Sequence, residues 1–243
     1  MKLQESLENQ GEILFRNRGF IPLLFVAFSI PVSYFNSYEL MTSNSIVEYV
    51  VLGSALACIF LGHLIRVQVI LARQDATSGR NRNEQVADSL NTKGWYSIVR
   101  NPLYVGNFLI WFGLSLYLFS FWLSLMLVLM FWMYYERIIF AEEAFLSRKF
   151  GQEYSDWCNE TPVFIPKMSG YKALKYKFSL SKVVFSEYSS FLSTATCFLF
   201  VSILREYSIH HEIHFGKLSW IYVLFFLVFG LSVKGIKQLK SPN

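Results

Sequence analysis

Six apolar blocks are the feature of this 243-residue sequence that most limits its fold. They are Phe20–Phe35, Ile46–Leu71, Leu103–Phe119, Trp122–Phe140, Val183–Leu204 and Leu218–Val233. Each approaches or exceeds the roughly 20 residues that an α-helix needs to cross the hydrocarbon layer of a bilayer. Charged residues make up only 16% of the chain, which is low for a soluble protein. The sequence therefore predicts an all-α, polytopic transmembrane protein with about six spans.

The first apolar block is the least regular of the six. It is one of the two shortest and contains Pro22 and Pro31, so we expect it to be kinked or only partly embedded. No cleavage site built of small residues follows it. We therefore predict a retained span rather than a removable signal peptide.

Lys and Arg residues predict the orientation in the membrane. They gather before the first block, after the second, after the fourth and at the end of the chain, whereas the opposite connections hold only Arg205 and Lys217. By the positive-inside rule, both termini are cytoplasmic. The net charge of +5 thus lies at membrane edges, where it matches anionic lipid head groups. The predicted partner is the bilayer and not nucleic acid.

The polar connections divide the chain into four parts. They are a cytoplasmic N-terminal segment (1–19), two spans (20–71), a core of cytoplasmic loop, helical hairpin and interfacial helix (72–166), and a basic linker with a C-terminal transmembrane hairpin (167–243). A short turn around Ser120 makes spans three and four antiparallel neighbours, so Arg100 and Glu142 are expected to meet. The interfacial helix is predicted over Ala141–Trp157, with a break at Gly151.

A first polar motif, Arg100-Asn101-Pro102-Leu103-Tyr104-Val105-Gly106, opens the third block. Pro102 stands where a helix can begin. The first amides of that helix and the guanidinium of Arg100 suit a carboxylate or phosphate ligand. The alternative is that Arg100 only anchors the helix at head-group level.

A second motif follows the fourth block. Glu142 and Glu143 are adjacent, Phe150-Gly151-Gln152-Glu153-Tyr154 comes next, and Thr161–Pro166 ends the segment. Two acids beside a span are costly unless they are solvated or paired. A solvated helix start, favoured by the helix dipole, is the alternative explanation for the acids. An interfacial aromatic anchor is the alternative for Tyr154.

Together the two motifs resemble the superfamily of isoprenylcysteine carboxyl methyltransferases and phospholipid methyltransferases. Its members carry Arg-His-Pro-x-Tyr-x-Gly, a hairpin, Glu-Glu and Phe-Gly-x-x-Tyr, and the order and spacing agree here from about Leu61 to Pro166. The resemblance implies an S-adenosylmethionine-dependent methyltransferase with a cytoplasm-facing cofactor site and a lipid-like acceptor that enters from the bilayer. Asn101 replaces the family's His. Its amide forms hydrogen bonds but does not titrate, so a general base at this position is in doubt.

The resemblance also implies roles for individual residues. Arg100 is expected to orient the acceptor's anion, and Glu142 or Glu143 to pair with Arg100 or with cationic groups of the cofactor. Other residues are expected to line the cofactor site: Asn101, Tyr104, Gly106 and Tyr154. No resident metal is predicted.

The replaced His favours an acceptor that needs no base, such as a carboxylate on a lipidated molecule or a lipid phosphate. A phospholipid amine would need deprotonation, with Glu142 or Glu143 as the nearest candidates. Two further alternatives stay open: a nicotinamide-dependent membrane reductase and a non-catalytic membrane protein. Binding of S-adenosylmethionine distinguishes these classes.

Three remaining groups of residues have simpler explanations. His63 and Arg66 lie inside the second block and are expected to face the protein interior, where Arg66 either reaches the site or extends to the head groups. His210 and His214 would share a helical face, but a solvated loop is favoured over a metal site. The cysteines are predicted to be packing residues: Cys58, Cys158 and Cys197.

Overall fold

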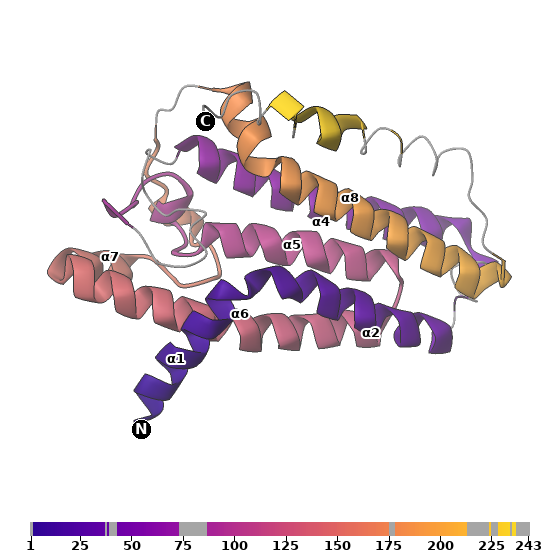
Figure 1. Ribbon diagram of the computed structural model, residues 1–243, viewed down its shortest axis with the longest axis horizontal. Helices are drawn as coiled ribbons and strands as arrows, with labels where there is room; N and C mark the ends of the chain where they lie inside the picture. The colour runs from indigo at the N-terminus through magenta and orange to yellow at the C-terminus, as the bar shows by residue number, and fades with distance from the viewer. Residues whose placement is uncertain are drawn as a thin grey trace. The chain divides into compact units, whose positions relative to one another are not determined.

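The computed structural model describes residues 2–36, 38, 43–72, 87–174, 178–212, 224, 228–233 and 235–236. Over these residues the chain is helical, and the predicted all-α class is confirmed. The elements in chain order are α1 (Leu3–Arg16), η1 (Arg18–Phe20), α2 (Ile21–Phe35), α4 (Ser45–Ala72), η2 (Trp95–Ser97), α5 (Pro102–Tyr117), α6 (Phe121–Phe150), α7 (Gln152–Glu160), η3 (Met168–Gly170) and α8 (Leu180–His210) (Figure 1). Pro102 begins α5, as predicted.

Helices α4, α6 and α8 are long and apolar enough to cross a membrane. Two shorter apolar helices accompany them, over Leu23–Phe35 and Pro102–Tyr117. These helices are typical of an integral membrane protein. The sixth predicted span, Leu218–Val233, lies largely outside the described residues, so the number of spans and their orientation stay predictions.

The predicted separate interfacial helix is wrong in its start. Helix α6 continues without interruption from the fourth apolar block to Phe150. No Gly or Pro occurs between Phe121 and Phe150, whereas Gly151 adopts φ 53° and ends the helix, as predicted. Glu142 and Glu143 therefore stand on a long continuous helix rather than on a mobile helix start.

The end predicted for the fifth span, Leu204, is also too early. Helix α8 extends to His210, and Arg205 is a buried helix residue rather than a loop residue. Arg205 Nη2 lies 2.9 Å from Glu48 Oε1, and its guanidinium is 4.6 Å from the centre of the Tyr117 ring. A buried charge is tolerated when it is paired, which explains why the helix continues past this residue.

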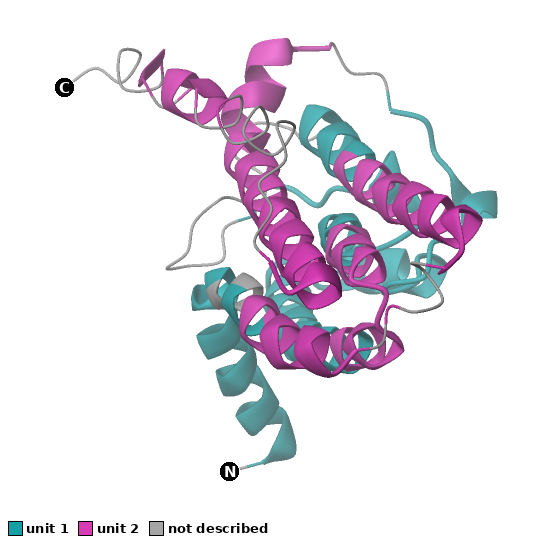
Figure 2. Ribbon diagram, turned by 90° about the vertical axis from the view of Figure 1, so that its right-hand side faces the viewer, with its two compact units in different colours: residues 1–24, 64–108, 128–177 teal, residues 25–63, 109–127, 178–243 magenta. Residues whose placement is uncertain are grey.

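The chain divides into two compact units, coloured separately in Figure 2. Unit 1 comprises residues 1–24, 64–108 and 128–177, and unit 2 comprises residues 25–63, 109–127 and 178–243. Unit 2 has an apolar core to which α2, α5, α6 and α8 contribute. Its members are Phe25, Leu114, Leu118, Leu123, Leu127, Cys197 and Val201.

Unit 1 joins two polar segments by backbone hydrogen bonds. The amide of Arg100 donates to the carbonyl of Pro162 at 2.8 Å, and the amide of Lys167 donates to the carbonyl of Ile98 at 2.9 Å. Gly94 forms an isolated bridge with Lys172. The segment before α5 is thus held against the segment after α7, and both motifs lie in one unit.

Helix α1 packs against α6 within unit 1. Tyr134 Oη donates to the carbonyl of Leu14 at 2.9 Å, and Arg148 Nη1 lies 2.8 Å from Glu8 Oε2. A Cβ at Gly11 would overlap the carbonyl of Arg137, so a larger residue does not fit at this contact. The N-terminal segment is therefore a docked helix.

Candidate functional site

Arg100 stands directly before α5 and meets residues of α6 and α7. Its Nη1 lies 3.1 Å from Glu143 Oε1 and donates to Cys158 Sγ at 3.0 Å. The two charged side chains are only 14% and 27% exposed. Burial acts to lower the pKa of Arg100, but Glu143 and Cys158 act to raise it, and the net shift is upward. The guanidinium is therefore held in its charged form, and of the two acids predicted as its partner, Glu143 is the one that it contacts.

Glu142 faces a different partner because consecutive helix residues point about 100° apart. Tyr104 Oη on α5 donates to Glu142 Oε1 at 2.9 Å. The Tyr104 ring also packs against Tyr135, with 4.5 Å between ring centres. Within the part of the chain that the structure describes, Glu142 has no salt bridge. A carboxylate held by a hydroxyl group is suited to receive a cation.

Asn101 holds the two polar segments together. Its Nδ2 donates to the carbonyl of Val163 at 3.2 Å, beside the backbone bond between Arg100 and Pro162. Its own carbonyl accepts from the amide of Tyr104, the first such bond at the start of α5. This positioning role was not predicted, because the sequence does not reveal that Thr161–Pro166 returns to the start of α5.

Tyr154 lies on α7 and is 5% exposed. Burial raises the pKa of Tyr154, as do neighbouring Cys158 and Glu143, so its hydroxyl stays protonated. Among the described residues, no group makes a hydrogen bond of good geometry with Tyr154 Oη or Arg100 Nε, although both atoms are buried and the Cys158 thiol lies beside Tyr154. An unsatisfied buried polar atom costs about 1–3 kcal/mol. A polar ligand beside Arg100 would recover this cost.

Gly106 is buried on α5, two residues after Tyr104. A helix turns by about 200° over two residues, so Gly106 faces away from Tyr104. The structure does not bring Gly106 to the Arg100–Glu143 pair, and its role in binding a cofactor stays a prediction.

Asn107 belongs to a polar group that was only partly predicted. Arg66 Nη1 on α4 donates to Asn107 Oδ1, and Asn107 Nδ2 donates to Tyr135 Oη on α6 at 3.3 Å. Arg66 therefore points to the protein interior, which is one of its two predicted positions. The signal that was missed is the presence of Asn107 inside an apolar span, where polar groups need partners.

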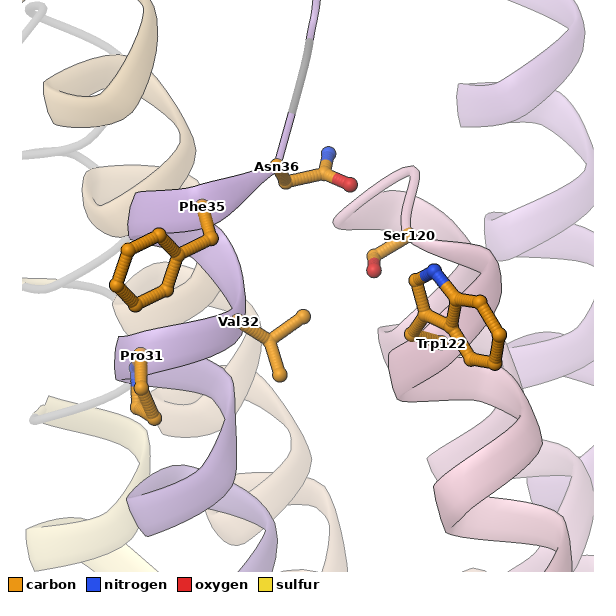
Figure 3. Close-up of a pocket in the computed structure, with 6 residues that line it drawn as sticks. All are labelled: Pro31, Val32, Phe35, Asn36, Ser120 and Trp122. Atoms are coloured by element: carbon orange, nitrogen blue, oxygen red, sulfur yellow. The ribbon is translucent and has the colours of Figure 1, made fainter.

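A small hollow in unit 2 is separate from these residues. Its lining consists of Pro31, Val32, Phe35, Asn36, Ser120 and Trp122. In Figure 3, Val32 and Asn36 point from the end of α2 toward Ser120, at the turn between α5 and α6. The lining contains no titratable side chain, so this hollow is not the candidate site.

The remaining predicted groups lie elsewhere. His63 Nε2 lies 3.1 Å from Thr194 Oγ1, with its ring stacked on Phe191. His214 is outside the described residues, and no group of three or more His, Cys, Asp or Glu side chains among the described residues is arranged to hold a metal. Cys58 and Cys197 are at least partly buried, but Cys158 is more than a packing residue because it accepts from Arg100.

Comparison with known proteins supports the motif assignment. Residues 50–153 match the model of the phospholipid methyltransferase family. Protein-S-isoprenylcysteine O-methyltransferase of Schizosaccharomyces pombe is 32% identical over 114 residues, or 46% of this chain and 48% of that protein. The enzyme of the same name from Tribolium castaneum is 34% identical over 118 residues, or 46% of this chain and 40% of that protein. The expected resemblance to this superfamily is confirmed.

A third relative is not named as a methyltransferase. The nickel-cobalt-cadmium resistance protein of Alcaligenes xylosoxydans xylosoxydans is 38% identical over 96 residues, or 40% of this chain and 42% of that protein. The chain thus aligns with less than half the length of each of these three relatives. No solved structure matches the chain.

Proposed function

We propose that this chain, whose residues 50–153 match the phospholipid methyltransferase family, is an integral membrane methyltransferase. Its donor would be S-adenosylmethionine and its acceptor an anionic oxygen, carboxylate or phosphate, of a lipid-like molecule. The observation that carries the proposal is the convergence of Arg100, Glu143 and Tyr154 from the start of α5, from α6 and from α7, with Glu142 adjacent to Glu143 and bonded to Tyr104. These are the residues on which the family resemblance rests.

The residues present fit the donor. S-adenosylmethionine carries a sulfonium, an ammonium and a carboxylate. Glu142, with a hydroxyl partner and no salt bridge among the described residues, suits a cationic group. Arg100 and Tyr154 offer buried polar atoms that make no hydrogen bond of good geometry among the described residues, and these atoms suit a carboxylate. A group suited to the donor's cations and groups suited to its carboxylate thus lie in the same unit.

The chemistry asked of the protein is mainly positioning. When bound, S-adenosylmethionine supplies a methyl group activated by the sulfonium. Glu142 and Arg100 would hold the donor's charged groups, and the packing around Tyr104 and Tyr135 would exclude water. An anionic oxygen nucleophile loses charge as it meets a cationic donor, so a dry site favours the reaction. Because such a nucleophile carries no proton, the absence of a titratable group at Asn101 is compatible with turnover.

A phospholipid amine is the alternative acceptor, because the matching family is that of the phospholipid methyltransferases. It would require a base, and Glu142 is the carboxylate available next to the site. A comparison of methyl transfer to lipid carboxylates, lipid phosphates and phospholipid amines separates the two acceptor classes.

Replacing Asn101 tests whether its amide contact with Val163 matters. Asn101→Leu is expected to reduce turnover about 3- to 10-fold, because loss of a hydrogen bond worth about 1 kcal/mol loosens the segment that carries Arg100. Asn101→His is expected to stay near the wild-type rate, since its Nδ1–H can donate to the same carbonyl. Turnover and thermal unfolding in detergent measure both. Wild-type values for Asn101→Leu would contradict the positioning role.

Calorimetry tests donor binding directly. The purified protein is expected to bind S-adenosylmethionine saturably and not to bind a nicotinamide dinucleotide. Tyr104→Phe is expected to weaken binding about tenfold or more, because Glu142 loses a charged hydrogen bond worth about 1.5–3 kcal/mol.

Tyr134→Phe is the matched control for this experiment. It also removes one hydroxyl from unit 1, but that hydroxyl binds the carbonyl of Leu14. Its affinity for S-adenosylmethionine is expected to equal that of the wild type. If neither the wild type nor the control binds S-adenosylmethionine, the proposed function is wrong.

A further inference from the structure

A polar chain inside unit 1 lies next to the donor site and is not used by it. Arg66 on α4 donates to Asn107 on α5, and Asn107 donates to Tyr135 on α6. Three apolar helices thus bring a cation, an amide and a phenol together. Polar and charged groups at such positions are costly, so their presence in a membrane protein points to a function.

This chain adjoins the proposed donor site through two tyrosines. The ring of Tyr135 is 4.5 Å from the ring of Tyr104, whose hydroxyl donates to Glu142. A molecule bound by Arg66 and Asn107 would therefore be separated from Glu142 by little more than the two rings. The polar chain and the proposed donor site are therefore neighbours within unit 1, as donor and acceptor subsites have to be.

A second guanidinium adds positive charge to the same region. Arg18, in η1 after the docked helix α1, lies over the ring of Phe15 at 4.0 Å. It acts electrostatically on Tyr135 and Glu142, as Arg66 does on Tyr135. Two cations therefore act on Tyr135, and one of them, Arg18, also acts on the carboxylate of Glu142.

Aromatic side chains extend from Tyr135 to the surface of the unit. Phe131 stacks on Tyr135 with 4.1 Å between ring centres. Phe164 lies 6.2 Å from Phe131 and also 6.2 Å from Trp132, which is 56% exposed. A row of packed aromatic side chains thus leads from an exposed tryptophan to the polar chain. A molecule with a hydrocarbon tail and an anionic head matches both parts.

We propose that Arg66, Asn107 and Tyr135 form the subsite that receives the anionic group of a lipid-like acceptor, with its hydrocarbon chain along Phe131 and Phe164. A guanidinium recognises a carboxylate or a phosphate through paired N–H donors, and the amide and phenol add further polar contacts. The proposal rests on the proposed function and deepens it. Arg100, expected from the sequence to orient the acceptor's anion, is thereby assigned to the donor.

Binding of simple lipids tests the subsite without methyl transfer. The probes are dodecanoate, dodecyl phosphate, dodecylamine and dodecanol, titrated by calorimetry into the purified full chain in a nonionic detergent. Dodecanoate or dodecyl phosphate is expected to bind more tightly than dodecanol and dodecylamine. Whichever of the two anions binds more tightly identifies the acceptor as a carboxylate or a phosphate.

Variants tie this binding to named residues. Arg66→Gln is expected to weaken binding of the anionic probe about tenfold or more, and Arg66→Lys to retain most of it because the charge is kept. Tyr135→Phe preserves both ring contacts and is expected to weaken binding about threefold, as for the loss of one hydrogen bond. Arg148→Gln is the matched control, because Arg148 is 61% exposed and pairs with Glu8 away from the subsite. Affinity for S-adenosylmethionine is expected to change less than about twofold in Arg66→Gln.

The outcomes separate this proposal from the proposed function. If S-adenosylmethionine binds but the anionic probes bind no better than dodecanol, the subsite is wrong and the donor site stands. The same conclusion follows if Arg66→Gln and Tyr135→Phe both keep wild-type affinity for the probe. If the probes bind in an Arg66-dependent way and S-adenosylmethionine does not bind, the lipid subsite stands and the methyltransferase proposal fails.

Discussion

Replacing Arg100 with glutamine is expected to reduce methyl transfer by a factor of about 10³, the upper range for loss of one charge-stabilising donor. Its guanidinium contacts both Glu143 and Cys158 and carries an unsatisfied Nε. The variant removes the group proposed to hold the donor's carboxylate and leaves the carboxylate of Glu143 without its cation. Affinity for S-adenosylmethionine is therefore expected to fall together with turnover, as measured by calorimetry and by transfer of a labelled methyl group.

A double variant separates binding from stability. Breaking a fully buried ion pair costs about 3–5 kcal/mol, and because Arg100 and Glu143 keep some exposure, we expect a smaller loss of unfolding free energy in Arg100→Gln. Adding Glu143→Gln is expected to restore much of that stability, since no unpaired charge is left, but not turnover. Arg148→Gln is again the control, with little change in either quantity. Near-wild-type turnover in the folded double variant would remove Arg100 from the site.

The positions of the helices could be predicted from the sequence, because a helix that crosses a bilayer needs a long apolar segment. Long apolar blocks predicted α4, α5 and the start of α6 closely, and the short turn at Ser120 predicted the antiparallel hairpin of α5 and α6. The hairpin is confirmed by contacts of opposite register, such as Phe108 with Phe131 in unit 1 and Ser115 with Ser124 in unit 2. The ends of the helices could be predicted less well from the sequence. Helix α8 runs past Leu204 because Arg205 finds Glu48, a partner distant in the chain.

The candidate site, like the helices, could be predicted from the sequence only in part. The motif identified Arg100, Glu142 and Tyr104, and spacing placed an acid near Arg100. It did not choose between Glu142 and Glu143, because that choice depends on the rotation of α6 by about 100° per residue. Neither the contact of Asn101 with Val163 nor that of Arg100 with Cys158 follows from any local pattern. Both depend on how the chain returns after Gly151.

The exchange of a family His for Asn101 is easier to understand from the fold than from the motif. The position lies where the start of α5 meets Thr161–Pro166, and its side chain donates to a carbonyl there. Both Asn and His can make such a bond, but only His can also carry a second proton. At this position the structure therefore shows a positioning contact and no titratable group. This favours acceptors that arrive already deprotonated.

Replacing Glu142 with glutamine is expected to weaken binding of S-adenosylmethionine about 10- to 100-fold, because charged hydrogen-bonded pairs contribute about 1.5–3 kcal/mol. The substitution keeps the shape of the side chain, and its amide oxygen can still accept from Tyr104. Only the negative charge is lost. Turnover is expected to fall by about 10² or more, since the charge also stabilises the sulfonium in the reacting geometry.

The melting temperature distinguishes Glu142→Gln from Glu143→Gln. Because Glu142 interacts electrostatically with Arg18 but forms no salt bridge among the described residues, removal of its charge breaks no ion pair, and the melting temperature is expected to stay the same or rise. Glu143→Gln should lower it, because Arg100 then loses its carboxylate partner. Glu136→Gln is the matched control on α6, since Glu136 is exposed. If Glu142→Gln binds S-adenosylmethionine as tightly as the wild type does, then Glu142 does not hold a cationic group of the donor and its assignment to the donor site is wrong.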